Sequence, residues 1–129
     1  MRERLLERLL RYVKIYTPSD ENSESSPSTK WQFDLAHELE EEMKALGVSD
    51  VYVDENCYVY GHIPAAEGYE SVPKLAFIAH MDTVKDFCDK PVTSVVHENY
   101  DGGDIFLEAG NRTISVKDYP HLKGMKGRT

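Results

Sequence analysis

Two segments of the chain repeat apolar and polar residues with the period of an α-helix. In the first, apolar side chains recur every three or four residues, and Arg, Glu and Lys fill the opposite face. The apolar positions are Leu5, Leu6, Leu9, Leu10, Val13 and Tyr16. This pattern predicts a packed first helix that ends before Thr17-Pro18.

A second helix is predicted to begin near Thr29, because Thr29 and Gln32 have the spacing of a capping box. Ser28 is the alternative cap. Gly47 is well placed to end the helix. Its apolar face comprises Trp31, Leu35, Leu39, Met43 and Leu46. Residues 17–28, between the helices, have no large apolar side chain and contain two prolines, which predicts an exposed loop.

Strand patterns follow the second helix. Val51 and Val53 alternate with polar neighbours, and residues 58–63 form a second such stretch after a turn at 54–56, which predicts a hairpin. Residues 75–79 are a continuous apolar run, typical of a central parallel strand covered by helices on both sides.

Weaker strand patterns cover residues 92–97 and 105–107, separated by a turn signal at 101–104, and the last dozen residues indicate irregular coil. The order of helices and strands predicts an α/β fold with an incomplete sheet. A length of 129 residues with 40% apolar content fits one packed domain.

Charge and cysteine content narrow the class of protein. The net charge is -8 and provides no basic field, so binding to nucleic acid or to an anionic membrane is not expected. No apolar run approaches the roughly 20 residues that span a bilayer. Cys57 and Cys88 follow no signal peptide, so we expect two free thiols in a reducing cytoplasm.

The strongest candidate chemistry is at His80 and Asp82, directly after the apolar run. In an extended chain these two side chains point to the same side. A neutral imidazole is a good zinc ligand, and a carboxylate that accepts its other ring N–H fixes the tautomer. His80 is therefore a candidate metal ligand with Asp82 as its orienting partner, although a purely structural hydrogen bond is the alternative.

Other motifs give weaker evidence for a functional site. The run His37-Glu38-Leu39-Glu40-Glu41 resembles the H-E-x-x-H zinc motif but has glutamate in the last position, so a solvated helix face is expected. His62, His97 and His121 lack neighbours at ligand spacing. Phosphate-binding glycine loops and the serine-hydrolase motif are absent from the sequence.

Several segments together resemble the peptidase T family of tripeptide aminopeptidases, within the wider group of di-zinc exopeptidases. The matching segments are Leu5-Leu6-Glu7-Arg8 with Tyr12-Val13, Pro27-Ser28-Thr29 with Gln32, Leu46-Gly47, Phe77-Ile78-Ala79-His80-Met81-Asp82-Thr83 with Asp86-Phe87, and Glu98-Asn99-Tyr100-Asp101-Gly102-Gly103-Asp104-Ile105. The motif at residues 80–83 is shared across the wider group, whereas residues 98–105 are typical of peptidase T.

The resemblance implies functions for two residues. His80 corresponds to a ligand of one zinc ion, and Asp82 to the catalytic carboxylate that orients this ligand. The family fold is a three-layer αβα domain with a mixed sheet, and its cytoplasmic enzyme uses two zinc ions to release the N-terminal residue of a tripeptide.

The resemblance also implies that most of the family's active-site residues are absent from this sequence. The family's bridging aspartate, its Glu-Glu pair, its further ligands and its dimerisation or lid domain have no counterpart in residues 1–129, which correspond to the N-terminal portion of the catalytic domain. Because zinc sites need three or four protein ligands, we expect this chain alone to be inactive. An uncovered sheet edge would also allow self-association. A related aminoacylase or carboxypeptidase and a non-catalytic interaction module are the alternatives.

Overall fold

The computed structural model describes residues 1–86 and 90–129, without the side chain of Ala109. Phe87 and Cys88, named above, lie outside the described residues. The chain divides into two compact units, Met1–Val92 and Thr93–Thr129. The described residues form a small α/β structure with two short antiparallel sheets. Within the described part of the chain, no helix combines the length and apolar character needed to cross a bilayer.

Helix α1 covers Arg2–Tyr12 and confirms the first predicted helix. Its apolar stripe is not packed as expected, since Leu5 and Leu9 are 56% and 57% exposed. The reason is that α1 meets the second helix through charged side chains. Arg8 and Arg11 both pair with Glu42, and Leu5 and Leu9 stay exposed beside this charged contact.

Helix α2 covers Gln32–Ala45 and confirms the second predicted helix. Its C-terminus is closed by Gly47 at φ +80°, with hydrogen bonds from Gly47 N–H to the Lys44 carbonyl and from Val48 N–H to the Met43 carbonyl. The predicted capping box does not form, because α2 begins after Trp31, past Thr29. The Gln32 amide instead donates to the Thr29 hydroxyl at 3.3 Å.

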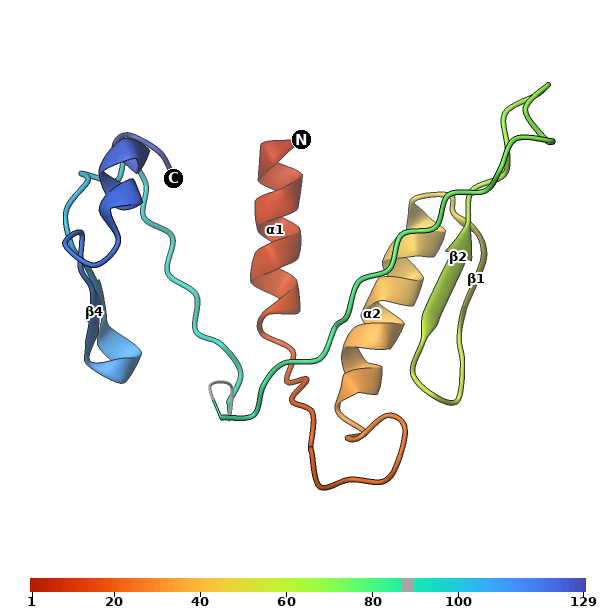
Figure 1. The fold of residues 1–129 in the computed structure, drawn as a ribbon, viewed down its shortest axis with the longest axis horizontal. Coiled ribbons are helices and arrows are strands. Elements are labelled where there is room, and N and C mark those ends of the chain that lie inside the picture. The colour runs from red at the N-terminus through yellow and green to blue at the C-terminus, as the bar shows by residue number, and fades with distance from the viewer. Residues whose placement is uncertain (87–89) are drawn as a thin grey trace. The chain divides into compact units, whose positions relative to one another are not determined.

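Strands β1 (Ser49–Val53) and β2 (Val59–His62) form the predicted antiparallel hairpin. The Asp54 carboxylate accepts hydrogen bonds from the amides of Asn56 and Tyr58 and so holds the turn. Figure 1 shows α2 beside this hairpin. At Gly61 the approach is close enough that an added Cβ would overlap Met43 and lie 2.8 Å from Val48 Cγ1.

Residues 75–79 do not form the central strand that the sequence predicts. The structure assigns them no strand, and the green tube after β2 runs without an arrow in Figure 1. Leu75, Phe77 and Ile78 are 80%, 90% and 97% exposed. A strand needs a hydrogen-bonded neighbour, and no described residue provides one for this run. The predicted strand at 92–97 is also absent.

In the second unit, β3 (Ile105–Leu107) confirms one predicted strand. It pairs with β4 (Arg112–Ile114), which follows the short 3₁₀ helix η1 (Glu108–Gly110). The last residues, expected to be irregular, contain the 3₁₀ helix η2 (Pro120–Met125), where Leu122 is buried. Tyr100 is held to this end of the unit because its amide donates to the Arg128 carbonyl and its carbonyl accepts from Gly127.

Candidate metal-ligand site

His80 and Asp82 lie close together after the apolar run. His80 Nδ1 is 3.1 Å from Asp82 Oδ1 and 3.0 Å from the Asp82 carbonyl oxygen. Neither a carboxylate nor a carbonyl can donate, so Nδ1 must carry the proton that joins them. In the neutral ring, this leaves the Nε2 lone pair free to bind a metal ion.

The exposed fractions of the two side chains fit His80 as a metal ligand and Asp82 as the residue that orients it. The His80 side chain is 85% exposed, whereas the Asp82 side chain is 40% exposed. Among the described residues, no three His, Cys, Asp or Glu side chains are grouped so that they could hold a metal ion. His80 and Asp82 therefore fit one corner of a zinc site by donor chemistry but do not form a complete one.

The segment that carries this pair is held by a backbone clamp at Thr83. The Thr83 amide donates to the Thr17 carbonyl at 3.0 Å, and the Ser19 amide donates to the Thr83 carbonyl at 2.9 Å. Pro18 and Thr83 form a parallel bridge, and Thr17 is only 3% exposed. The start of the predicted exposed loop at residues 17–28 is therefore buried, because it docks on the site segment.

Two supports of the site, Thr17 and Ser19, are not predicted from the sequence. Both are small polar residues in a stretch that has the composition of a solvated loop. Ser19 and Thr83 are 64 positions apart, and no local periodicity in the sequence predicts such a contact. The only available signal was the Thr17-Pro18 step, where the helical pattern stops.

A cleft of about 430 Å³ lies beside this pair within the first unit. Its lining is mostly apolar and comes from the end of α1, the inner face of α2, β2 and residues 79–83. Tyr16 and Leu39 are among the apolar residues, and His80 and Asp82 contribute the polar side. The cleft thus brings the pair next to apolar surface that the described residues leave uncovered.

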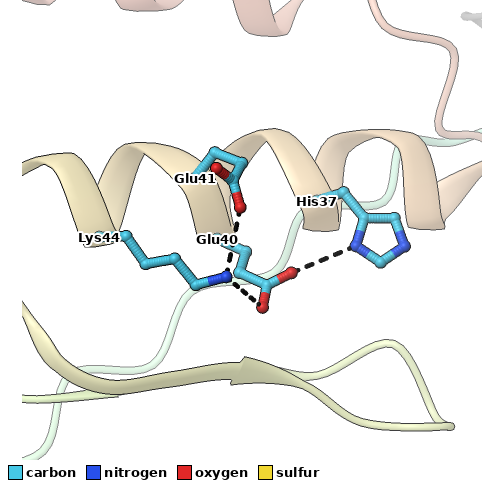
Figure 2. A network of polar contacts seen from close by, with 4 residues as sticks. All are labelled: His37, Glu40, Glu41 and Lys44. Carbon is cyan, nitrogen blue, oxygen red and sulfur yellow. Dashed lines mark hydrogen bonds and ion pairs between the residues drawn. The ribbon is translucent and has the colours of Figure 1, made fainter.

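The H-E-x-x-H-like run on α2 takes part in an ion network of His37, Glu40, Glu41 and Lys44, as Figure 2 shows. His37 Nδ1 is 3.3 Å from Glu40 Oε2, and Lys44 Nζ is 2.9 Å from Glu40 Oε1. The hydrogen bonds from Lys44 and His37 lower the pKa of Glu40. His37 is 63% exposed, which agrees with the predicted solvated face.

The other histidines show no metal-site geometry in the described structure. His62 Nδ1 lies 3.6 Å from Asp50 Oδ2 on the exposed hairpin. The His121 ring contacts only the edge of the Tyr119 ring among aromatic neighbours in the described residues. The Asp101–Asp104 stretch is a turn, as predicted, since the Asp101 carboxylate accepts from the Gly103 amide at 2.7 Å.

Comparison with known proteins gives a consistent result along the whole chain. Peptidase T of Alkaliphilus oremlandii is 49% identical over 127 residues, which is 97% of this chain and 31% of that protein. The peptidase T proteins of Geobacillus thermodenitrificans and Bacillus pumilus are 46% and 45% identical over the full chain and 31% and 32% of their own lengths. No protein-family model matches the sequence. The resemblance to peptidase T is therefore confirmed over the whole chain, and the chain spans about a third of the length of these relatives.

Proposed function

We propose that this chain contributes His80 and Asp82 to the di-zinc site of a cytoplasmic tripeptide aminopeptidase. The observation that carries the proposal is the hydrogen bond from His80 Nδ1 to Asp82, which leaves Nε2 open on an exposed ring. The names of the relatives favour peptidase T over an aminoacylase or a carboxypeptidase.

Each residue has a distinct part in this proposal. His80 Nε2 is the metal-binding atom. Asp82 accepts the Nδ1 proton, which fixes the ring orientation and raises the basicity of Nε2. The clamp from Thr83 to Thr17 and Ser19 holds the segment that carries both side chains. When bound, two zinc ions would acidify the attacking water and polarise the scissile carbonyl of the tripeptide.

The rest of the site would come from the two thirds of a peptidase T chain that these residues do not span. That remainder would supply the other ligands and the general base, and it would complete a three-layer αβα domain around the apolar run. One histidine cannot hold two metal ions, so the 129-residue chain should bind zinc weakly and hydrolyse nothing alone.

A chimera tests this proposal. The matching segment of Alkaliphilus oremlandii peptidase T is replaced by the present sequence, and tripeptide hydrolysis is measured with zinc or cobalt beside the 129-residue chain. We expect activity in the chimera alone. In the chimera, His80→Ala should lower kcat/KM by more than about 100-fold, and Asp82→Asn by about 10–100-fold.

Zinc content and zinc affinity provide the second readout. Loss of zinc in the His80→Ala chimera, with full zinc content in a His62→Ala control, would separate ligation from a general effect on folding. Metal-dependent cleavage by the 129-residue chain, or an active chimera unaffected by His80→Ala, would overturn the proposal.

A further inference from the structure

The peptide group between Asp82 and Thr83 is hydrogen-bonded on both sides. Its carbonyl oxygen, on Asp82, is 3.0 Å from His80 Nδ1. Its N–H, on Thr83, donates to the Thr17 carbonyl at 3.0 Å. Because a peptide group is planar, the bond to Thr17 also fixes the direction of the carbonyl that meets the imidazole ring. The clamp therefore acts on the orientation of His80 through one rigid unit.

A second peptide group, between Pro18 and Ser19, supports the clamp in the same way. Its N–H, on Ser19, donates to the Thr83 carbonyl at 2.9 Å, and the Ser19 hydroxyl donates to the same oxygen at 3.2 Å. Its carbonyl oxygen, on Pro18, accepts from the Thr29 hydroxyl at 2.6 Å. Hydrogen bonds at the two ends of one peptide group polarise and orient each other. Thr29 therefore fixes the plane of the peptide group whose N–H holds Thr83.

Gln32, the first residue of α2, orients the Thr29 hydroxyl. A hydroxyl has one hydrogen, and the Pro18 carbonyl only accepts, so the hydrogen of Thr29 points to Pro18. The Gln32 side-chain amide then donates to the Thr29 oxygen at 3.3 Å. It also donates at 3.3 Å to the Ser28 hydroxyl, whose oxygen accepts from the Asp20 amide. Because Gln32 is only 8% exposed, this support is anchored in the packed part of the first unit.

Ser28 and Thr29 do not cap the helix that follows them. Serine and threonine just before a helix ordinarily bond to the free amides of its first turn. In the described structure α2 has no side-chain cap, and the two hydroxyls bond to the Asp20 amide and the Pro18 carbonyl, on either side of Ser19. Loss of the Thr29 hydroxyl would therefore leave the hydrogen bonds of α2 intact and release the loop that holds Thr83.

We infer that Thr29, supported by Gln32, is a positioning residue for His80, on the basis of the proposed function of His80 as a zinc ligand. Hydrogen bonds lead from Thr29 through Ser19 and Thr83 to the peptide group that contacts His80 Nδ1. Because Thr29 acts on the ring through other residues, its loss should weaken zinc binding and lower kcat while KM stays nearly constant.

Amide hydrogen exchange of the metal-free 129-residue chain measures this coupling without zinc. Thr29→Val keeps the shape of the side chain and removes the hydroxyl, so we expect the Ser19 and Thr83 amides to exchange about tenfold faster. Amides of the β1–β2 hairpin should keep their rates, which separates local loosening from a loss of overall stability. Thr29→Ser should restore both rates. Ser25→Ala is the matched control, since that hydroxyl bonds to Pro27 within the exposed loop.

Zinc affinity and steady-state kinetics of the chimera test the link to the site. Thr29→Val should weaken zinc binding and lower kcat by about 3–10-fold, less than the roughly 10–100-fold typical of a residue that contacts the ligand directly. Thr29→Ser should restore both values. Gln32→Met removes the amide that supports Thr29, so it should act in the same direction with a smaller effect. It carries the same measurements if Thr29→Val does not fold.

The outcomes distinguish the positioning role from the proposed function. Faster exchange at Ser19 and Thr83 with weaker zinc binding, both restored by Thr29→Ser, supports the role. Unchanged zinc affinity in Thr29→Val, in a chimera that loses zinc on His80→Ala, would overturn it and leave the proposed function standing. Exchange that is unchanged, or that rises equally at the hairpin, would also overturn it. A chimera whose zinc content ignores His80→Ala would instead overturn the proposed function.

Discussion

The α2–hairpin region and the run at residues 75–79 are both rich in apolar residues, yet only the first is packed. Leu35 on α2 is 7% exposed and Ala36 is completely buried, whereas Ile78 is 97% exposed. The difference lies in where the partner comes from. Helix α2, β1 and β2 follow one another within residues 32–62, so the chain supplies both sides of this contact locally. The apolar run needs a neighbouring strand that no described residue supplies.

A matched pair of leucine substitutions tests this comparison most strongly. Leu35→Ala removes buried methyl groups and should lower the free energy of unfolding by about 2–4 kcal/mol. Leu75→Ala removes the same atoms from a side chain that is 80% exposed, so it should change stability by less than about 0.5 kcal/mol. Urea unfolding followed by circular dichroism measures both variants. Equal effects of the two substitutions would contradict the difference in packing.

The close approach of α2 to the hairpin gives a second, smaller test. Gly61→Ala would place a methyl group against Met43 and Val48, so we expect a loss of about 1–3 kcal/mol from overpacking. Gly124→Ala is the control, since a Cβ at that position meets no atom within 4 Å. Thermal unfolding of the two variants should separate them by several degrees. A neutral Gly61→Ala would mean that the helix and the hairpin are farther apart in solution.

The charged contact between α1 and α2 gives the smallest expected effect. Burial alone would raise the pKa of Glu42, but the hydrogen bond from Tyr12 and the charges of Arg8 and Arg11 outweigh it and lower this pKa. A lowered pKa in the folded state stabilises the protein above the ordinary glutamate value of 4.5, and this contribution is lost as pH falls through the folded-state pKa.

The unfolding free energy should therefore decline below about pH 4.5, and Glu42→Gln should flatten that decline by less than about 1 kcal/mol. Glu21→Gln, on the exposed loop, controls for the loss of one negative charge. Urea unfolding at a series of pH values measures the three slopes. An unchanged slope in Glu42→Gln would show that this contact does not hold α1 to α2.

Local elements of the fold could be predicted from the sequence because each has a short-range cause. The 3.6-residue period of apolar positions predicted both helices, and Gly47 follows the end of α2 as expected. Alternation around the turn at Asp54 predicted the hairpin. The prediction of a central strand at residues 75–79 was wrong. An apolar run indicates that a segment favours burial, but it does not indicate which distant residues would cover it.

The candidate site shows the same division. His80 and Asp82 could be singled out because residues two apart in an extended chain share a side. The clamp from Thr83 to Thr17 and Ser19 could not be predicted, because small polar residues carry no apolar signal and the Ser19–Thr83 contact crosses 64 positions. The catalytic and metal-binding assignments of His80 and Asp82 stay predictions until the chimera is measured.

The clamp at Thr83 also sets an order of events in folding. Its hydrogen bond to Ser19 joins residues 64 positions apart. Closing a long loop costs conformational entropy before the contacts that it allows can form. Helix α2 and the hairpin lie inside that loop and can form before it closes. During synthesis the clamp can form only after Thr83 has left the ribosome, so the segment with His80 and Asp82 is secured after the residues of α2 and the hairpin are already available to fold.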